Sequence, residues 1–331
     1  MLKVTVAVVC YNERDNIKEC LSSLVHQTYP RDAYELVFVD NESDDGTREI
    51  IRSFAQQYDN IRLIVNPVRG IAGSRNLALK EAQYDYIAFV DADCVAPENW
   101  LHTLASGFER YHAMDSHVVG VGGSNVPPEN STRFYDVLRI FLNTYLGSRG
   151  STQGMRFAQD RPVPHIPTVN VLFDKKAVLD VGGFDTSFGN IGEDQDLSYR
   201  LQKRGYYYYY LSDAAVIHKL RSDLKKWAKN MYVYGLGRMW LIRKHPDRLE
   251  VVLLAPFLLV ASFPVMTMTA LHPIFAVPAL YFVFILLISF IEGRRAGKLK
   301  YVPDLFVLYS VTHIAYGIGQ WAGLFVNRRK L

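Results

Sequence analysis

The sequence has few cysteines, little net charge and no N-terminal targeting signal. Its three cysteines, Cys10, Cys20 and Cys94, have the spacing of neither a zinc site nor a disulfide framework, which suits a reducing compartment. A net charge of +4 over 331 residues is too small to indicate nucleic-acid binding. The short apolar run 4–10 is followed at once by charged residues, without a small-residue cleavage site. We therefore expect no secretory signal and a cytosolic first domain.

Long hydrophobic runs are also missing from most of the chain, but not from its last quarter. Hydrophobic residues make up 49% of the sequence, slightly more than is usual for a soluble protein. The run 249–271 carries one charge, Glu250, and the run 273–291 carries none. Each is long enough to cross a hydrocarbon layer of ~30 Å. A third run, 301–326, contains an aspartate and a histidine and is a weaker candidate.

We expect three parts: a domain over 1–221, an amphipathic interface helix over 222–248 and a transmembrane region over 249–331. In the interface segment basic residues alternate with aromatic and apolar ones, a pattern typical of a helix on a membrane surface, in contact with lipids. Two basic clusters flank the hydrophobic runs and indicate cytoplasmic ends: Arg243, Lys244, His245 and Arg248, then Arg294, Arg295, Lys298 and Lys300. The expected location is the plasma membrane, with the first domain in the cytoplasm.

The number of spans stays open at this point. Three spans would place the basic tail 327–330 outside, against the tendency of positive residues to remain inside. Either the tail escapes that tendency, or one run is re-entrant or interfacial.

Strand and helix patterns alternate through the first hundred residues. β-rich apolar runs at 4–10, 36–39, 61–65 and 86–90 are separated by segments with helical spacing. This alternation predicts an α/β domain with a parallel sheet, which binds ligands at the carboxyl ends of its strands. Further on, prolines mark loops around a predicted helix at 133–146.

Five consecutive tyrosines, residues 206–210, follow a glycine. They are expected to form a packed hairpin or edge strand rather than an aromatic platform for sugars.

Two carboxylates one residue apart, Asp91 and Asp93, follow the buried strand 86–90. At the carboxyl edge of a sheet such a pair is placed to hold a hard divalent cation, which in turn holds a diphosphate. The alternative is a solvated acidic loop.

Six short motifs, in order, resemble those of the family 2 glycosyltransferases. They are Val8-Val9-Cys10-Tyr11-Asn12-Glu13, Val39-Asp40-Asn41-Glu42-Ser43-Asp44-Asp45-Gly46-Thr47, Ala72-Gly73-Ser74-Arg75-Asn76 with Arg69-Gly70, Asp91-Ala92-Asp93, Gly182-Gly183-Phe184-Asp185 and Glu193-Asp194. The resemblance covers about residues 3 to 240. It implies the GT-A nucleotide-sugar-binding (Rossmann-like) fold, a nucleotide-sugar donor, most simply a UDP-hexose, a divalent metal (Mg²⁺ or Mn²⁺) and inversion at the anomeric carbon.

The resemblance assigns the donor nucleotide to residues at the ends of the first strands. Asp40 would accept hydrogen bonds from the nucleobase imide and ribose hydroxyls, with Tyr11 and Glu13 beside it. Glu13 could instead favour a helix start through the macrodipole. In the glycine-containing loop that enters a helix, Arg75 is favoured over Arg69 as the phosphate contact.

The metal and the chemistry are assigned in the same way. Asp93 resembles the direct metal ligand and Asp91 a partner of the ribose or of the ligand. His218 resembles the late histidine that completes some GT-A metal sites, although a structural role is the alternative. Asp194 resembles the general base that deprotonates the acceptor hydroxyl, and Glu193 would position sugar hydroxyls.

Arg238 lies about where processive relatives carry a Gln-x-x-Arg-Trp motif, yet the glutamine and the spacing are absent. It is a candidate contact for a diphosphate or a lipid phosphate. The sequence therefore favours an inverting, metal-dependent hexosyltransferase that acts on a lipid-linked (polyprenyl diphosphate) saccharide, most similar to exopolysaccharide transferases of the succinoglycan type. Transfer to polyprenyl phosphate, processive synthesis and a non-catalytic binding module remain as alternatives.

Overall fold

The computed structural model describes residues 1–68, 70–129 and 131–326. The chain divides into two compact units. Unit 1 consists of Met1–Pro128 and Gly150–Leu220, and unit 2 of Glu129–Arg149 and Arg221–Leu331. Unit 2 thus takes in residues 129–149, which lie inside the range expected for the first domain.

Unit 1 is built on an eight-stranded sheet with the strand order β3-β2-β1-β4-β9-β6-β10-β8. The strands are β1 (Val4–Cys10), β2 (Tyr34–Asp40), β3 (Ile61–Val65), β4 (Tyr86–Val90), β6 (Val118–Gly122), β8 (Arg161–Val163), β9 (Asn170–Asp174) and β10 (Tyr207–Tyr210). The first four are parallel, as predicted. β9 runs antiparallel between β4 and β6, so the sheet is mixed. A strand that joins a sheet parallel to its neighbour needs a long crossover, usually a helix. β9 is antiparallel, and with it the regular alternation of strand and helix in the sequence ends.

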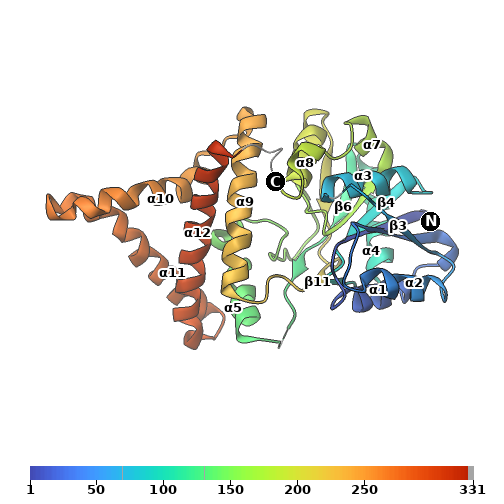
Figure 1. Cartoon of the computed structure of the whole chain (residues 1–331), viewed down its shortest axis with the longest axis horizontal. Helices are drawn as coiled ribbons and strands as arrows, with labels where there is room; N and C mark the ends of the chain where they lie inside the picture. The colour runs from blue at the N-terminus through green and yellow to red at the C-terminus, as the bar shows by residue number, and fades with distance from the viewer. Residues whose placement is uncertain (69, 130, 327–331) are drawn as a thin grey trace. The chain divides into compact units, whose positions relative to one another are not determined.

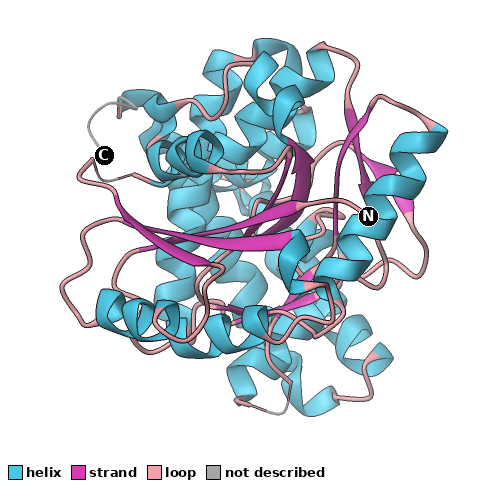
Figure 2. Ribbon diagram, turned by 90° about the vertical axis from the view of Figure 1, so that its right-hand side faces the viewer, coloured by secondary structure: helices cyan, strands magenta, loops and turns pink. Residues whose placement is uncertain are grey.

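Helices cover both faces of this sheet (Figures 1 and 2). They are α1 (Ile17–Val25), α2 (Thr47–Ala55), α3 (Ile71–Glu81), α4 (Trp100–Met114), α7 (Lys175–Asp180) and α8 (Glu193–Lys203), with 3₁₀ turns η1 (Arg31–Ala33) and η2 (Thr186–Phe188). α1, α2 and α4 share one core with Val6 and Val8 of β1, whereas α3, α7 and α8 share another with Ala7. Successive side chains of a strand point to opposite faces, so a strand buried on both sides is mainly apolar on both faces.

The tyrosine run forms β10, which is paired on both sides, with β6 and with β8. Tyr208 and Tyr210 are fully buried, and Tyr208 packs edge-on against Phe173. The prediction of a packed strand is confirmed. The strand lies inside the sheet rather than at its edge, because the short β8 covers it.

Unit 2 is helical. Its elements are α5 (Arg133–Leu142), α6 (Tyr145–Ser148), α9 (Leu224–Lys244), η3 (Pro246–Arg248), η4 (Val251–Leu254), α10 (Ala255–Met266), η5 (Thr267–Ala270), η6 (Pro273–Ala279), α11 (Leu280–Arg295), η7 (Leu299–Tyr301) and α12 (Val302–Phe325). The single helix predicted at 133–146 is interrupted after Leu142. Thr144 accepts a hydrogen bond from the backbone N–H of Gly147 and so begins a new helix.

Within the described residues, one helix, Ala276–Arg295, is long and apolar enough to cross a membrane by length and composition. The apolar helix Val251–Met266 is shorter, and the 3₁₀ turn Thr267–Ala270 follows it within the run 249–271. The run 301–326 forms the long helix α12, which buries polar side chains such as Gln320 against its neighbours.

Helices α9 and α12 approach each other closely at glycines. A Cβ atom on Gly319 would lie 1.9 Å from the carbonyl oxygen of Tyr232, and one on Gly235 would lie 2.0 Å from that of Tyr316. Neither contact is compatible with van der Waals radii, so the two backbones can pack at this distance only with hydrogen in place of a side chain.

Gly319→Ala is therefore expected to destabilise unit 2 by about 1–3 kcal/mol, the usual cost of overpacking. Thermal unfolding of the purified full chain measures it. Ile318→Ala, a change at the exposed neighbouring residue, is the matched control. An unchanged midpoint for Gly319→Ala would mean that the two helices are free to separate.

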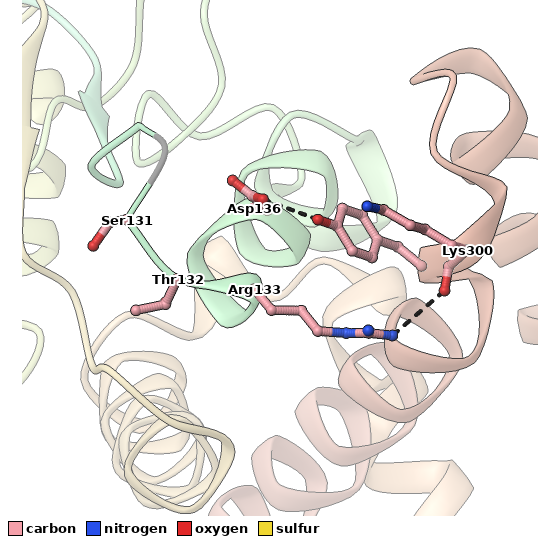
Figure 3. A pocket seen from close by; sticks show the side chains of 6 residues that line it. Ser131, Thr132, Arg133, Asp136 and Lys300 are labelled. Atoms are coloured by element: carbon pink, nitrogen blue, oxygen red, sulfur yellow. Dashed lines mark hydrogen bonds between the residues drawn. The ribbon is translucent and has the colours of Figure 1, made fainter.

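Unit 2 contains a polar hollow of about 470 Å³ beside the start of α5 (Figure 3). Arg133 forms two hydrogen bonds to Asp304, of 3.0 and 2.7 Å. The hydroxyl of Tyr301 donates to Asp136 at 2.9 Å, and the ammonium of Lys300 lies 5.1 Å from the centroid of the Tyr301 ring. These charges mainly neutralise one another and tie α5 to η7 and α12.

Candidate active site

Most of the predicted site residues of unit 1 lie at the carboxyl ends of β1, β2 and β4 and at the start of α8, while Arg75 lies in α3. A second, three-stranded sheet extends this edge, with the order β5-β11-β7. Its strands are β5 (Cys94–Val95), β7 (Asn125–Val126) and β11 (Val216–His218). β11 pairs with β5 so that His218 lies opposite Cys94, next to the acidic pair.

Asp93 and His218 form the candidate metal centre. The Nε2 atom of His218 lies 3.2 Å from Oδ1 of Asp93. Cys94 brings a third donor, and single ligand atoms of the three side chains all lie within 4.8 Å of one another. Burial, together with the nearby Asp93 and Asp91 carboxylates, raises the pKa of the Cys94 thiol well above its usual value. A carboxylate oxygen suits Mg²⁺ or Mn²⁺, and a neutral imidazole is a common metal ligand, so Asp93 and His218 fit such a cation.

Asn125 supports this centre from β7 and was not found by sequence reasoning. Its Nδ2 lies 2.9 Å from Nδ1 of His218. Its Oδ1 is buried and has no hydrogen-bond partner in the part of the chain that the structure describes. If the amide of Asn125 were rotated by half a turn, its Oδ1 would accept a hydrogen bond from a protonated Nδ1 of His218. The Nε2 atom of His218, which faces Asp93, would then carry no proton. A histidine that binds a metal through Nε2 needs this tautomer.

Arg75 links the acidic pair to the start of α8. Its buried guanidinium forms an ion pair with Glu193 and a second one, at 3.4 Å, with Asp91. Burial raises the pKa of Glu193 to about 7, with Arg75 opposing and Asp194 adding to the shift. Burial also raises the pKa of Asp91, again opposed by Arg75 and strengthened by Asp93. Oε2 of Glu193 is buried without a partner among residues 1–68, 70–129 and 131–326.

The start of α3 differs from the open phosphate-binding end that the sequence predicts. The N–H of Ile71 donates to Oδ1 of Asn190 at 2.9 Å, and that of Ala72 donates to the carbonyl of Gly189 at 3.3 Å. Loop 189–190 therefore occupies these donors, and phosphate could reach them only if the loop moved. Arg69, the other candidate arginine, lies outside the described residues.

The nucleotide-side residues differ in how accessible they are. Asp40 is fully buried, and its carboxylate accepts from the backbone N–H and the hydroxyl of Ser43, at 2.9 and 2.5 Å. Tyr11 is 42% exposed. Glu13 accepts from the side-chain amide of Asn16 at 2.8 Å. The three lie near one another at the ends of β1 and β2, but contact of Asp40 with a nucleobase requires its turn to open and stays a prediction.

Asp194 lies in the first turn of α8, with its side chain 21% exposed. Its Oδ1 accepts from the N–H of Gln195 at 2.7 Å, and its Oδ2 lies 3.8 Å from Nε2 of His165. No sequence signal pointed to His165, which follows Pro164 in an irregular loop.

In unit 2, Arg238 lies on α9 and donates from Nε to the hydroxyl of Tyr316 at 3.1 Å.

The family described as Glycosyl transferase family 2 matches residues 5–182, more than half of the chain. Glycosyltransferase AglE of Haloferax volcanii is 28% identical over 270 residues, which cover 79% of this chain and 81% of that protein. A poly-beta-1,6-N-acetyl-D-glucosamine synthase of Staphylococcus aureus is 30% identical over 203 residues, or 61% of this chain and 46% of the synthase.

Two solved structures share the fold. Mannosyltransferase PcManGT from Pyrobaculum calidifontis, in complex with GDP-Man and Mn²⁺, has a TM-score of 0.59 at 22% identity, covering 96% of this chain and 87% of its own. S. aureus TarS 1–349 in complex with UDP-GlcNAc has a TM-score of 0.53 at 18% identity, covering 97% and 91%.

Proposed function

Starting from the fact that this chain belongs to glycosyl transferase family 2, we propose that it is an inverting, metal-dependent hexosyltransferase with a lipid-linked acceptor. The chain is a glycosyltransferase with a GT-A-type α/β fold and acts on nucleotide sugars. The proposal adds the donor, a UDP-hexose, and the acceptor, a polyprenyl-diphosphate-linked saccharide at the cytoplasmic face of the plasma membrane.

One observation carries the proposal: acidic residues from distant parts of the sequence converge at one sheet edge. Asp91 and Glu193 meet at the two ends of the Arg75 guanidinium. Asp93 faces His218 within the same edge. A module that only binds a sugar nucleotide has no need of a further carboxylate such as Asp194 beside this set.

Each residue of the site has a separate role in the reaction. Asp194 takes the proton of the acceptor hydroxyl as its oxygen attacks the anomeric carbon from the face opposite the nucleotide. Glu193, held by Arg75, offers its unpartnered Oε2 to a sugar hydroxyl, and Asp91 accepts from the ribose. Asp93 and His218 would hold a divalent cation, which when bound neutralises charge on the leaving diphosphate.

Unit 2 supports a membrane acceptor. It contains the apolar helix Ala276–Arg295, and α9 places basic residues among aromatic ones. We propose that the runs 249–271 and 301–326 accompany this helix in the membrane and that Arg238 contacts a diphosphate or lipid phosphate. The similarity to a polysaccharide synthase favours polymer synthesis as the second candidate. Exopolysaccharide assembly would accommodate either product.

The test is a donor and acceptor screen with the full chain in lipid nanodiscs. UDP-glucose, UDP-N-acetylglucosamine and GDP-mannose are each offered with an undecaprenyl-diphosphate-linked hexose and with its water-soluble citronellyl analogue. Release of nucleoside diphosphate measures the rate, and the length of the product separates single transfer from polymerisation.

We expect turnover with a UDP-hexose and a clear preference for the long-chain acceptor. Arg238→Ala is expected to lower the rate on that acceptor about tenfold, since a charged hydrogen bond contributes ~1.5 kcal/mol or more. Lys229→Ala, another cation on α9, is the control. Equal rates on both acceptors, with no effect of Arg238→Ala, would show a tethered enzyme with a soluble acceptor.

A further inference from the structure

A histidine that no motif contains lies against the carboxylate of Asp194. His165 belongs to the loop between β8 and β9, and its Nε2 is 3.8 Å from Oδ2 of Asp194. Its Nδ1 is 2.8 Å from the hydroxyl oxygen of Ser198. The His165 and Asp194 side chains are 20% and 21% exposed, so the pair is partly shielded but still reaches solvent.

Ser198 joins this pair to the sheet. It lies four residues after Asp194, one helical turn further along α8, and its Oγ is 3.0 Å from the backbone carbonyl of Asp194. The same Oγ is 3.0 Å from the hydroxyl of Tyr208, which is fully buried in β10. A serine hydroxyl has one hydrogen to donate and two lone pairs that accept. Its three neighbours at hydrogen-bond distance therefore match its full capacity.

The proton positions in this group follow from that capacity. A neutral ring of His165 has two tautomers. With the proton on Nε2, Ser198 donates to Nδ1 and no longer donates to the carbonyl of Asp194. With the proton on Nδ1, Ser198 donates to the carbonyl, but the lone pair of Nε2 faces the carboxylate of Asp194. When the ring carries both protons, Nδ1–H and the Tyr208 hydroxyl donate to Ser198, and Ser198 donates to the carbonyl. Nε2–H then faces Oδ2 of Asp194 at ion-pair distance. Only in this doubly protonated state do all four contacts pair a donor with an acceptor.

We propose that His165 and Asp194 act as a dyad, in which His165 takes up the proton that Asp194 removes from the acceptor hydroxyl. The proposal rests on the function proposed above, which supplies the hydroxyl. The acceptor oxygen forms its bond to the anomeric carbon, and the bond from that carbon to the diphosphate oxygen breaks, its electron pair leaving with the nucleoside diphosphate. The proton passes from the acceptor to Oδ2 of Asp194 and then, through one bridging water, to Nε2 of His165, 3.8 Å away; from this partly exposed pair it passes to solvent.

The test uses His165→Ala in the full chain, assayed with the donor and acceptor that wild type turns over. We expect the rate to fall about 10²-fold, at the lower end of what acid–base help contributes. Affinity for the nucleotide sugar, measured by calorimetry, should remain within about twofold, since the dyad does not contact the donor. Free imidazole added to the assay should restore part of the rate. His117→Ala, at an exposed histidine bonded to Asp115, should behave as wild type and show no response to imidazole.

His165→Gln separates proton uptake from positioning. The glutamine amide can still bond Ser198 but cannot take a proton, so this variant should stay slow and should not respond to imidazole. Thermal unfolding shows whether each variant folds. If His165→Ala does not fold, the rate of His165→Gln alone tests the dyad.

Wild-type rates in His165→Gln, or a slow His165→Ala that imidazole does not restore, would overturn the dyad. A wild-type enzyme that releases no nucleoside diphosphate from any donor would instead contradict the proposed function.

Discussion

Asp194→Asn is expected to lower the rate of sugar transfer by about 10²- to 10⁴-fold, the range typical of a lost general base. The asparagine amide has nearly the same shape and keeps an oxygen to accept the 2.7 Å hydrogen bond from the N–H of Gln195. It has no affinity for the acceptor proton at neutral pH. The start of α8, and with it the donor site, should therefore remain intact while proton removal is lost.

Steady-state rates and a calorimetric dissociation constant for the nucleotide sugar measure this prediction. Asp180→Asn removes a carboxylate that pairs with Lys176 on the surface and serves as the matched control. Two results would contradict the role: an Asp194→Asn enzyme with wild-type turnover, or one whose donor affinity falls as far as its rate.

Removal of divalent cations is expected to abolish turnover, and Mn²⁺ or Mg²⁺ should restore it. Asp93 and His218 offer an oxygen and a nitrogen ligand 3.2 Å apart, and the diphosphate supplies further oxygens. The departing diphosphate gathers negative charge, which a cation stabilises by several kcal/mol, equivalent to about 10³-fold in rate or more. Asp93→Ala should reproduce the loss in the presence of metal.

Binding of Mn²⁺ is followed directly by electron paramagnetic resonance, so the metal site is tested apart from activity. Asn125→Ala should weaken Mn²⁺ binding by about 10- to 100-fold, as is usual when the partner of a ligating histidine is lost. Asp59→Ala, an exposed acid on unit 1, should bind Mn²⁺ as wild type does. Full activity in chelator, with metal shown absent by mass spectrometry, would contradict the prediction.

The sequence by itself determined the parallel half of the sheet. Its central strands are buried on both faces, so each appears as a mainly apolar run, and the intervening helices repeat with their own period. The acids that follow these strands had to reach the carboxyl edge, because all parallel strands end there. The tyrosine strand was predictable for a local reason too, since tyrosine favours strands and the run follows a glycine.

Only the tertiary structure decided which of these side chains touch. The antiparallel insertion of β9 and the small sheet of β5, β7 and β11 bring His218 to Asp93 and Asn125 to His218. The same holds for the ion pair of Arg75 with Glu193, the turn that encloses Asp40, and the loop that places His165 beside Asp194.

The difference has a physical cause. Periodicity records how one segment buries one face, and this is a local property of the chain. Contacts between residues dozens of positions apart depend on strand register and on irregular loops, which leave no period in the sequence. The glycines of α9 and α12 are a further case. Only the close approach of the two helices in the folded chain explains why these positions carry no side chain.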